Sequence, residues 1–355
     1  MKRIIALADR NSLRMLRLLA AVNVLFFLCF MVFLLMAAGK AHAEMPVCGG
    51  KDLLAGLQKD DPATYAKVEA EGHATQNGTG LLWKIDRDGA PSSYLYGTMH
   101  VTDPRVTGLP EAAKTAYDEA GTVVIETTEV LDQTKMMAVF AEHPDLMMFT
   151  DGTTLASLLP QEDMRTVDAA LAARGIPPES VAKMKPWVIS SMVALPACEL
   201  ARKAAGAPVL DIKLAEDAKK AGKEIDGLET IADQLGAMAS LPMELHVEGL
   251  VETLKLGDRM DDVIETMVAL YLKGETGMFW PFFRAALPSG AGADAGYGAF
   301  EETMVKARNK VMAERAGPIL RRGNAFVAVG ALHLPGAEGL IELLRQEGFT
   351  VTRAD

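Results

Sequence analysis

The chain has 355 residues, which suffices for one large domain or two modest ones. Half of the residues are apolar and 23% are charged, so the composition is that of a globular protein and excludes a disordered chain. The formal net charge of -11, spread along the sequence, argues against nucleic acid and against anionic membrane surfaces as partners.

The N-terminal segment has the layout of an export signal. An apolar stretch at 18–38 is followed by Ala41-His42-Ala43, a small-residue cleavage site, and is preceded by the basic residues Lys2, Arg3, Arg10, Arg14 and Arg17. We therefore predict a signal peptide at 1–43 and an exported, periplasmic protein. The alternative is an uncleaved inner-membrane anchor facing the periplasm, because the apolar stretch is just long enough to span a bilayer. Only such an anchor would make the membrane a partner.

Three cysteines bear on the compartment. Cys29 lies in the apolar leader, so Cys48 and Cys198 would remain in the exported protein. An even number of cysteines in an oxidising compartment predicts a disulfide between them, with two unrelated buried thiols as the alternative. The Cys-x-x-Cys spacing of zinc and redox sites is absent from the sequence.

The first predicted elements are a β-hairpin and a β-α-β unit. Apolar runs at 81–85 and 93–96 are separated by Asp-Arg-Asp-Gly, which is turn chemistry. A helix over 110–120 and a buried strand over 122–126 follow. A strand, a helix and another strand in this order predict that the two strands run parallel.

The middle of the chain is mostly helical by its periodicity. Helical patterns dominate the segments 131–205 and 231–320. Between them, a short predicted strand at 208–211 and a strand-like segment at 223–229 flank a helical pattern at 212–221, which predicts a second β-α-β unit.

A further buried strand is predicted over 325–330, and a short closing strand over 349–351. Together these elements predict a single compact α/β domain over 44–355. Its sheet would be mixed and partly parallel, flanked by many helices, with a large helical insertion in the middle of the chain.

The same tetrad, Gly-x-x-His, follows two of the predicted strands. Gly97 leads to His100, and Gly330 leads to His333. The glycine is expected to let the backbone turn sharply, and open α/β sheets bind ligands beyond the carboxyl ends of their strands. Glu126 ends a third strand. We therefore predict that the two histidines and Glu126 share one site, with ordinary hydrogen-bonded loop histidines as the alternative.

Two histidines and one carboxylate are a ligand set for a divalent metal, which makes His100, Glu126 and His333 the predicted ligands. The metal would lower the pKa of a bound water and make a nucleophile at neutral pH. Without a metal, Glu126 or a histidine would act as a general base on water.

Four further residues are candidates for contact with a substrate. Arg308 and Asn309 lie on a predicted helix before the last strand, where an arginine would bind a substrate carboxylate or stabilise an oxyanion. Asp211 and Glu229 end the strands of the second unit and are predicted to bind substrate. The plainer alternatives are a surface arginine, a helix N-cap at Asp211 and a solvated strand end at Glu229.

Taken together, these motifs resemble those of the TraB/GumN family, also called TraB/PrgY/GumN, whose animal relatives include the TIKI metalloproteases. The segments that carry the resemblance span residues 81 to 353 and are 94–100, 123–127, 209–211, 222–223, 227–230 with Gln234, 308–309 and 329–336. The sequences around Cys48 and Cys198 resemble the GumN-type bacterial branch.

The resemblance implies a fold related to erythromycin-esterase-like and ChaN-like proteins. It also implies an active site made of both Gly-x-x-His motifs, Glu126 and the Arg308-Asn309 pair, with manganese or cobalt as the activating ion. The leading hypothesis is an exported metal-dependent hydrolase, and more specifically a peptidase. The alternatives are a non-catalytic periplasmic protein that sequesters a peptide or saccharide, and a metal-independent esterase-like hydrolase.

Overall fold

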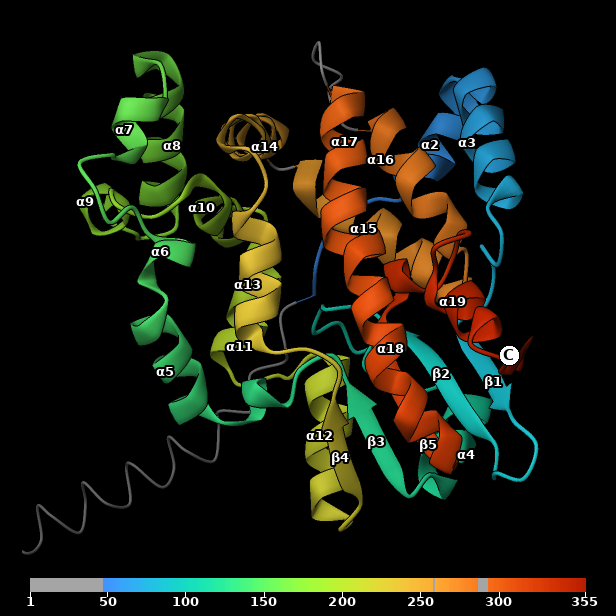
Figure 1. Ribbon diagram of the computed structural model, residues 1–355. Helices are drawn as coiled ribbons and strands as arrows, with labels where there is room; N and C mark the ends of the chain where they lie inside the picture. Colours follow the sequence, from blue (N-terminus) through green and yellow to red (C-terminus); the bar gives the residue numbers. More distant parts are fainter. Residues whose placement is uncertain (1–46, 258, 287–292) are drawn as a thin grey trace, which may run out of the picture. The chain divides into compact units, whose positions relative to one another are not determined.

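The computed structural model describes residues 47–257, 259–286 and 293–355 (Figure 1). The predicted leader at 1–43 lies outside these residues. Among the described residues, no helix combines the length and the apolar character needed to cross a bilayer. Residues Val47–Asp355 form one compact unit.

A six-stranded mixed sheet forms the centre of this unit, in the order β4-β3-β5-β2-β1-β6. Neighbouring strands among β4, β3, β5 and β2 run parallel, whereas β1 is antiparallel to both β2 and β6. The mixed sheet, the β1–β2 hairpin and the parallel β2 and β3 are confirmed. The strands are β1 (Leu82–Asp86), β2 (Ser93–Thr98), β3 (Thr122–Ile125), β4 (Glu224–Gly227), β5 (Ala325–Gly330) and β6 (Thr350–Arg353).

The connections between strands are mostly helical. Up to β4, the helices are α2 (Leu53–Asp60), α3 (Pro62–Ala74), α4 (Glu111–Glu119), η1 (Thr128–Leu131), α5 (Gln133–Glu142), α6 (Pro144–Met147), α7 (Leu155–Leu158), α8 (Gln161–Ala173), α9 (Pro178–Val181), α10 (Pro186–Val193), α11 (Ala197–Ala204) and α12 (Leu210–Lys220). After β4 come α13 (Ile231–Ala239), α14 (Met243–Leu256), α15 (Arg259–Leu272), η2 (Thr276–Met278), α16 (Phe279–Ala286), α17 (Ala293–Glu301), the π-helical η3 (Glu302–Lys306), α18 (Ala307–Arg322), η4 (Ala331–His333) and α19 (Leu340–Gln346).

Local sequence signals fix several helix ends. Asp61 caps α3 by accepting the Thr64 N–H, and a proline occupies the first helical position, where no backbone donor is needed. Thr230 and Asp233 form a reciprocal capping box at α13. Gly323 ends α18 with a φ of 75°, a conformation that a residue with a Cβ adopts only with strain.

Alternating side chains of the strands build two cores, one on each face of the sheet. On one face, Tyr96 and Phe326 pack with apolar residues of α4, α12 and α15. On the other face, Leu95 and Val327 pack with α18 and α19, which Figure 1 shows lying across the sheet. This alternation is the period of two expected of a strand buried on both sides. Truncating a side chain such as the fully buried Phe326 to alanine costs about 3–5 kcal/mol.

The helical segments between β3 and β5 have a small core of their own. Leu155, Leu171, Ile189 and Leu250 are buried together and come from α7, α8, α10 and α14. The insertion is therefore held by its own apolar packing, as expected for helices whose apolar stripes face one another.

The predicted strand at 208–211 is wrong, because α12 begins at Leu210. A short apolar run has the same pattern in a buried strand and in a buried helical turn. Here the buried positions Leu210, Leu214 and Ala218 recur every four residues, so they lie on one helical face.

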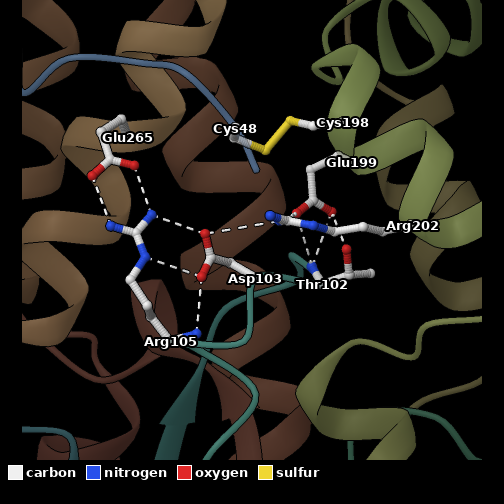
Figure 2. The surroundings of a disulfide bond; sticks show 8 residues. All are labelled: Cys48, Thr102, Asp103, Arg105, Cys198, Glu199, Arg202 and Glu265. Atoms are coloured by element: carbon white, nitrogen blue, oxygen red, sulfur yellow. Dashed lines mark hydrogen bonds and ion pairs between the residues drawn. A yellow bond between two sulfur atoms is a disulfide. The ribbon is translucent and has the colours of Figure 1, made fainter. Parts of the chain in front are cut away.

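The predicted disulfide is present between Cys48 and Cys198, whose Cα atoms lie 5.4 Å apart (Figure 2). It joins the segment that precedes α2 to helix α11 across 150 residues. Beside it, Arg202 of α11 contacts the carboxylates of Glu199 and Asp103. The bond therefore ties the start of the described chain to α11, and Arg202 links this helix to Asp103 in the loop that follows β2.

Candidate active site

The strand order brings together residues that are far apart in the chain. Because β5 lies between β2 and β3, the carboxyl ends of these three parallel strands are neighbours. His100 follows β2 by two residues, Glu126 follows β3 directly, and His333 lies in η4 just beyond β5. Glu126 Oε1 lies 3.8 Å from His333 Nε2, and His100 is close enough for its charge to lower the pKa of Glu126. The sequence-predicted trio thus meets at one edge of the sheet.

The glycines of the two motifs serve close packing and not the sharp turn that we expected. Neither Gly97 nor Gly330 has a positive φ. A Cβ on Gly97 would lie 2.7 Å from Leu334 Cδ1, and one on Gly330 would lie 3.3 Å from Glu126 Oε1. The first distance is too short for real carbon atoms and the second is tight, so a Cβ at either position would press on a neighbouring part of the site.

Asn309 holds His333 in one tautomer. The Asn309 amide nitrogen donates to the carbonyl oxygen of Glu338 at 2.8 Å, so its Oδ1 faces His333 Nδ1, at 2.6 Å. His333 Nδ1 must therefore carry the proton, and Nε2 is left with its lone pair directed at the site. Burial lowers the pKa of His333 to about 4, so the ring is neutral at pH 7. In the structure Asn309 thus positions a histidine.

Arg308 joins two buried carboxylates. Its Nη2 donates to Glu126 Oε2 at 2.8 Å and to Glu229 Oε2 at 2.6 Å, and its Nε donates to Glu229 at 3.1 Å. Gln234 donates to both carboxylates as well. Burial disfavours a charged Glu126, but His333, His100 and Arg308 together lower its pKa to about 2. The guanidinium is therefore engaged by the chain's own carboxylates and fixes their positions.

His100 pairs with Asp211. The two are 3.4 Å apart between His100 Nε2 and Asp211 Oδ2, and Thr98 Oγ1 donates to Asp211 Oδ1 at 2.5 Å. Desolvation opposes protonation of the ring, but the charge and hydrogen bond of Asp211 raise the pKa of His100 above its usual value. The His100 side chain is 58% exposed, whereas His333 is buried. The site therefore opens to solvent on the His100 side.

The loop after His100 is anchored by a buried glutamate that the sequence did not single out. Both oxygens of Glu199 accept from the Thr102 N–H, at 3.1 and 2.9 Å, and one also accepts from the Thr102 hydroxyl (Figure 2). Glu199 follows Cys198 on α11, so the helix that carries the disulfide also holds the His100 loop. A lone glutamate in a helical pattern gives no signal for this role.

The site contains the types of donor atom that divalent metals bind, namely imidazole nitrogens and carboxylate oxygens. The Asn309–His333 contact is the outer hydrogen bond that metal-ligating histidines usually make. Asp211 Oδ2 is buried and has no hydrogen-bond partner among the described residues. Two imidazoles with a carboxylate suit ions such as zinc, manganese and cobalt. Within the described part of the chain, however, no three histidine, cysteine, aspartate or glutamate side chains are already drawn together around one point.

A cavity of about 300 Å³ lies beside this cluster but does not include its histidines. Trp280, Arg284, Lys306 and Leu332 contribute to its lining, and Asn309 is the residue that it shares with the site. Neither Glu126 nor His333 lines it, so we assign it no part in the chemistry.

The chain resembles animal metalloproteases over most of its length. It is 25% identical over 318 residues to Metalloprotease TIKI2 of Danio rerio, which covers 76% of this chain and 60% of that protein. It is 24% identical over 322 residues to Metalloprotease TIKI1 of Homo sapiens, covering 77% and 62%. The chain thus spans about 60% of the length of these curated relatives. No solved structure gave a significant match.

The family assignment rests on a wider match than these pairwise ones. Residues 81–353, from β1 to β6, match the model of the TraB/PrgY/gumN family. That span contains every residue of the site described above. The match covers well over half of the chain, and the chain therefore belongs to the TraB/PrgY/gumN family.

Proposed function

We propose that this protein is an exported metal-dependent hydrolase that acts on peptides. One observation carries the proposal: the order β3-β5-β2 puts Glu126, His333 and His100 at one sheet edge. Membership of a family whose relatives include proteins named as metalloproteases supports it. Sheet edges of this kind are where α/β proteins bind ligands.

Some residues of the site would bind a metal, and others would hold these ligands in position. His333, neutral and with Nε2 free, and His100 would supply imidazole ligands, and a carboxylate of the cluster would complete the set. When bound, a divalent ion lowers the pKa of a coordinated water toward neutrality and so supplies a nucleophile. Arg308 fixes Glu126 in its place beside His333. The exposed side of His100 leaves room for a peptide to approach from solvent.

Export is a part of the proposal that rests on the sequence and on the disulfide. The leader pattern at 1–43 directs the chain out of the cytoplasm. The bond between Cys48 and Cys198 suits an oxidising compartment, because cytosolic thiols are kept reduced. We infer a periplasmic protein, with a retained N-terminal anchor as the alternative.

Cleavage of a peptide mixture by the full-length protein, followed by mass spectrometry, tests the function. We expect cleavage that stops on exhaustive chelation and returns with manganese, cobalt or zinc. His100→Ala and His333→Ala should each lose both the metal and the cleavage. His143→Ala is the matched control, because His143 is exposed at the start of α6, in the helical insertion.

Two outcomes would overturn this proposal in different ways. Cleavage that survives chelation and both histidine substitutions would place the chemistry elsewhere, as in a metal-independent esterase-like hydrolase. Tight binding of a peptide or saccharide with no product, with or without added metal, would make the protein a sequestering protein.

A further inference from the structure

The carboxylates of the site differ in whether they have an oxygen that is free to bind a cation. Glu126 uses Oε1 for the Gly330 N–H at 2.8 Å and Oε2 for Arg308 and Gln234. Glu229 uses both oxygens for Arg308. These two side chains are therefore already neutralised or hydrogen-bonded within the fold.

Asp211 is in a different position. It is only 8% exposed, its Oδ1 accepts the Thr98 hydroxyl, and its Oδ2 has no hydrogen-bond partner among the described residues. Although it lies in the first turn of α12, its side chain does not cap that helix. The His100 ring faces it, but Nε2 lies 3.4 Å from Oδ2 and makes no well-formed hydrogen bond with it. A buried acceptor without a hydrogen bond is destabilising, and a cation bound to both atoms would satisfy it.

The spacing between Asp211 and His100 suits two ligands of one ion. Zinc–nitrogen and zinc–oxygen bonds are about 2.1 Å long, so two ligands at a tetrahedral angle lie about 3.4 Å apart. Asp211 Oδ2 and His100 Nε2 are separated by 3.4 Å. Thr98 fixes the carboxylate through Oδ1, which is the outer-shell support that a metal ligand needs.

We propose that Asp211, and not Glu126, is the carboxylate ligand of a divalent transition metal in this protein. Asp211 Oδ2, His100 Nε2 and His333 Nε2 form the ligand set. Glu126 remains an outer residue, fixed by Arg308 and by the Gly330 amide. This inference rests on the proposed metal dependence, and it corrects the ligand set expected from the sequence.

Titration of the full-length protein with Co²⁺ alone, followed by calorimetry and absorbance, tests the assignment without any assay of activity. Asp211→Asn should weaken Co²⁺ binding by more than about 100-fold, since a direct ligand counts for more than the 10–100-fold of outer-shell partners. Glu126→Gln should weaken it less than Asp211→Asn does. Asp217→Asn, at a half-exposed carboxylate on the same helix that pairs with Lys213, should leave binding unchanged.

A cysteine placed at each position keeps the test decisive even where an amide variant folds poorly. Asp211→Cys should give a thiolate-to-cobalt charge-transfer band in the near ultraviolet, and Glu126→Cys should give none. A band from Glu126→Cys alone, or a greater loss of binding in Glu126→Gln than in Asp211→Asn, would overturn the inference and leave the metal-dependent function standing. Wild-type protein that binds neither Co²⁺ nor Mn²⁺ would overturn both.

Discussion

Removing Arg308 should destabilise the fold, because this side chain joins two buried carboxylates from different parts of the sheet. Its contacts to Glu126 and Glu229 range from 2.6 to 3.1 Å, and its side chain is only 12% exposed, so solvent screens them little. Breaking a buried ion pair by deleting one partner costs about 3–5 kcal/mol, since the other partner is left charged without a counter-ion.

The size of the effect on thermal unfolding follows from the length of the described unit. An unfolding entropy of about 2.1 cal/mol/K per residue gives roughly 0.65 kcal/mol/K for roughly 310 residues. Arg308→Met should therefore lower the unfolding midpoint by about 5–8 °C. Differential scanning calorimetry of the variant and the wild type, at the same protein concentration and without added metal, measures this shift.

Two companion variants separate the ion pair from a general effect of the substitution. Arg315→Met lies on the same helix, but Arg315 is 45% exposed and pairs with the exposed Asp233, so it should cost at most about 1 kcal/mol. Adding Glu229→Gln to Arg308→Met should restore part of the loss, by about 1–3 kcal/mol, because one uncompensated charge is removed. An Arg308→Met midpoint within a degree of wild type, or no rescue by the second change, would refute the reasoning.

Three further substitutions probe the scaffold of the site. Gly97→Ala should cost about 1–3 kcal/mol in urea unfolding, because its Cβ would enter the second Gly-x-x-His loop, and an unchanged midpoint would contradict the close packing. Replacing Cys48 and Cys198 by serine opens a loop of 150 residues, for which the chain-entropy model gives a loss of about 5 kcal/mol in the same assay; a loss below about 1 kcal/mol would argue that the bond does not form. Glu199→Gln should speed hydrogen exchange of the Thr102 amide, while exchange as slow as in wild type would show that another acceptor holds this loop.

The sequence was informative where local chemistry determines the structure. The hairpin of β1 and β2 follows from alternating apolar residues around an Asp-Arg-Asp-Gly turn, and β5 follows from a buried run of β-branched and apolar residues. The Gly-x-x-His motifs marked the two loops because the same tetrad follows two predicted buried strands. The pairing of Cys48 with Cys198 followed from there being no other cysteine after the predicted leader.

The strand order and the contacts of single side chains lay beyond reach of the sequence. The residues of β5 do not reveal that this strand lies between β2 and β3, because the strand order depends on the path of the long connections between strands. Asp211 was assigned to a strand end, whereas it begins a helix and turns its carboxylate toward His100. Asn309 was expected to contact substrate, but its role as the partner of His333 depends on a helix register that only the folded chain fixes.

The metal content of the protein is the most direct test of the whole account. The full-length protein, purified from the periplasm without chelators, should contain about one equivalent of a divalent transition metal by elemental analysis. The same preparation of His333→Ala should contain far less metal, because this variant lacks the imidazole ligand that Asn309 orients. Protein that is free of metal as isolated, takes up none on incubation with manganese, cobalt or zinc, and still cleaves peptides would contradict the account.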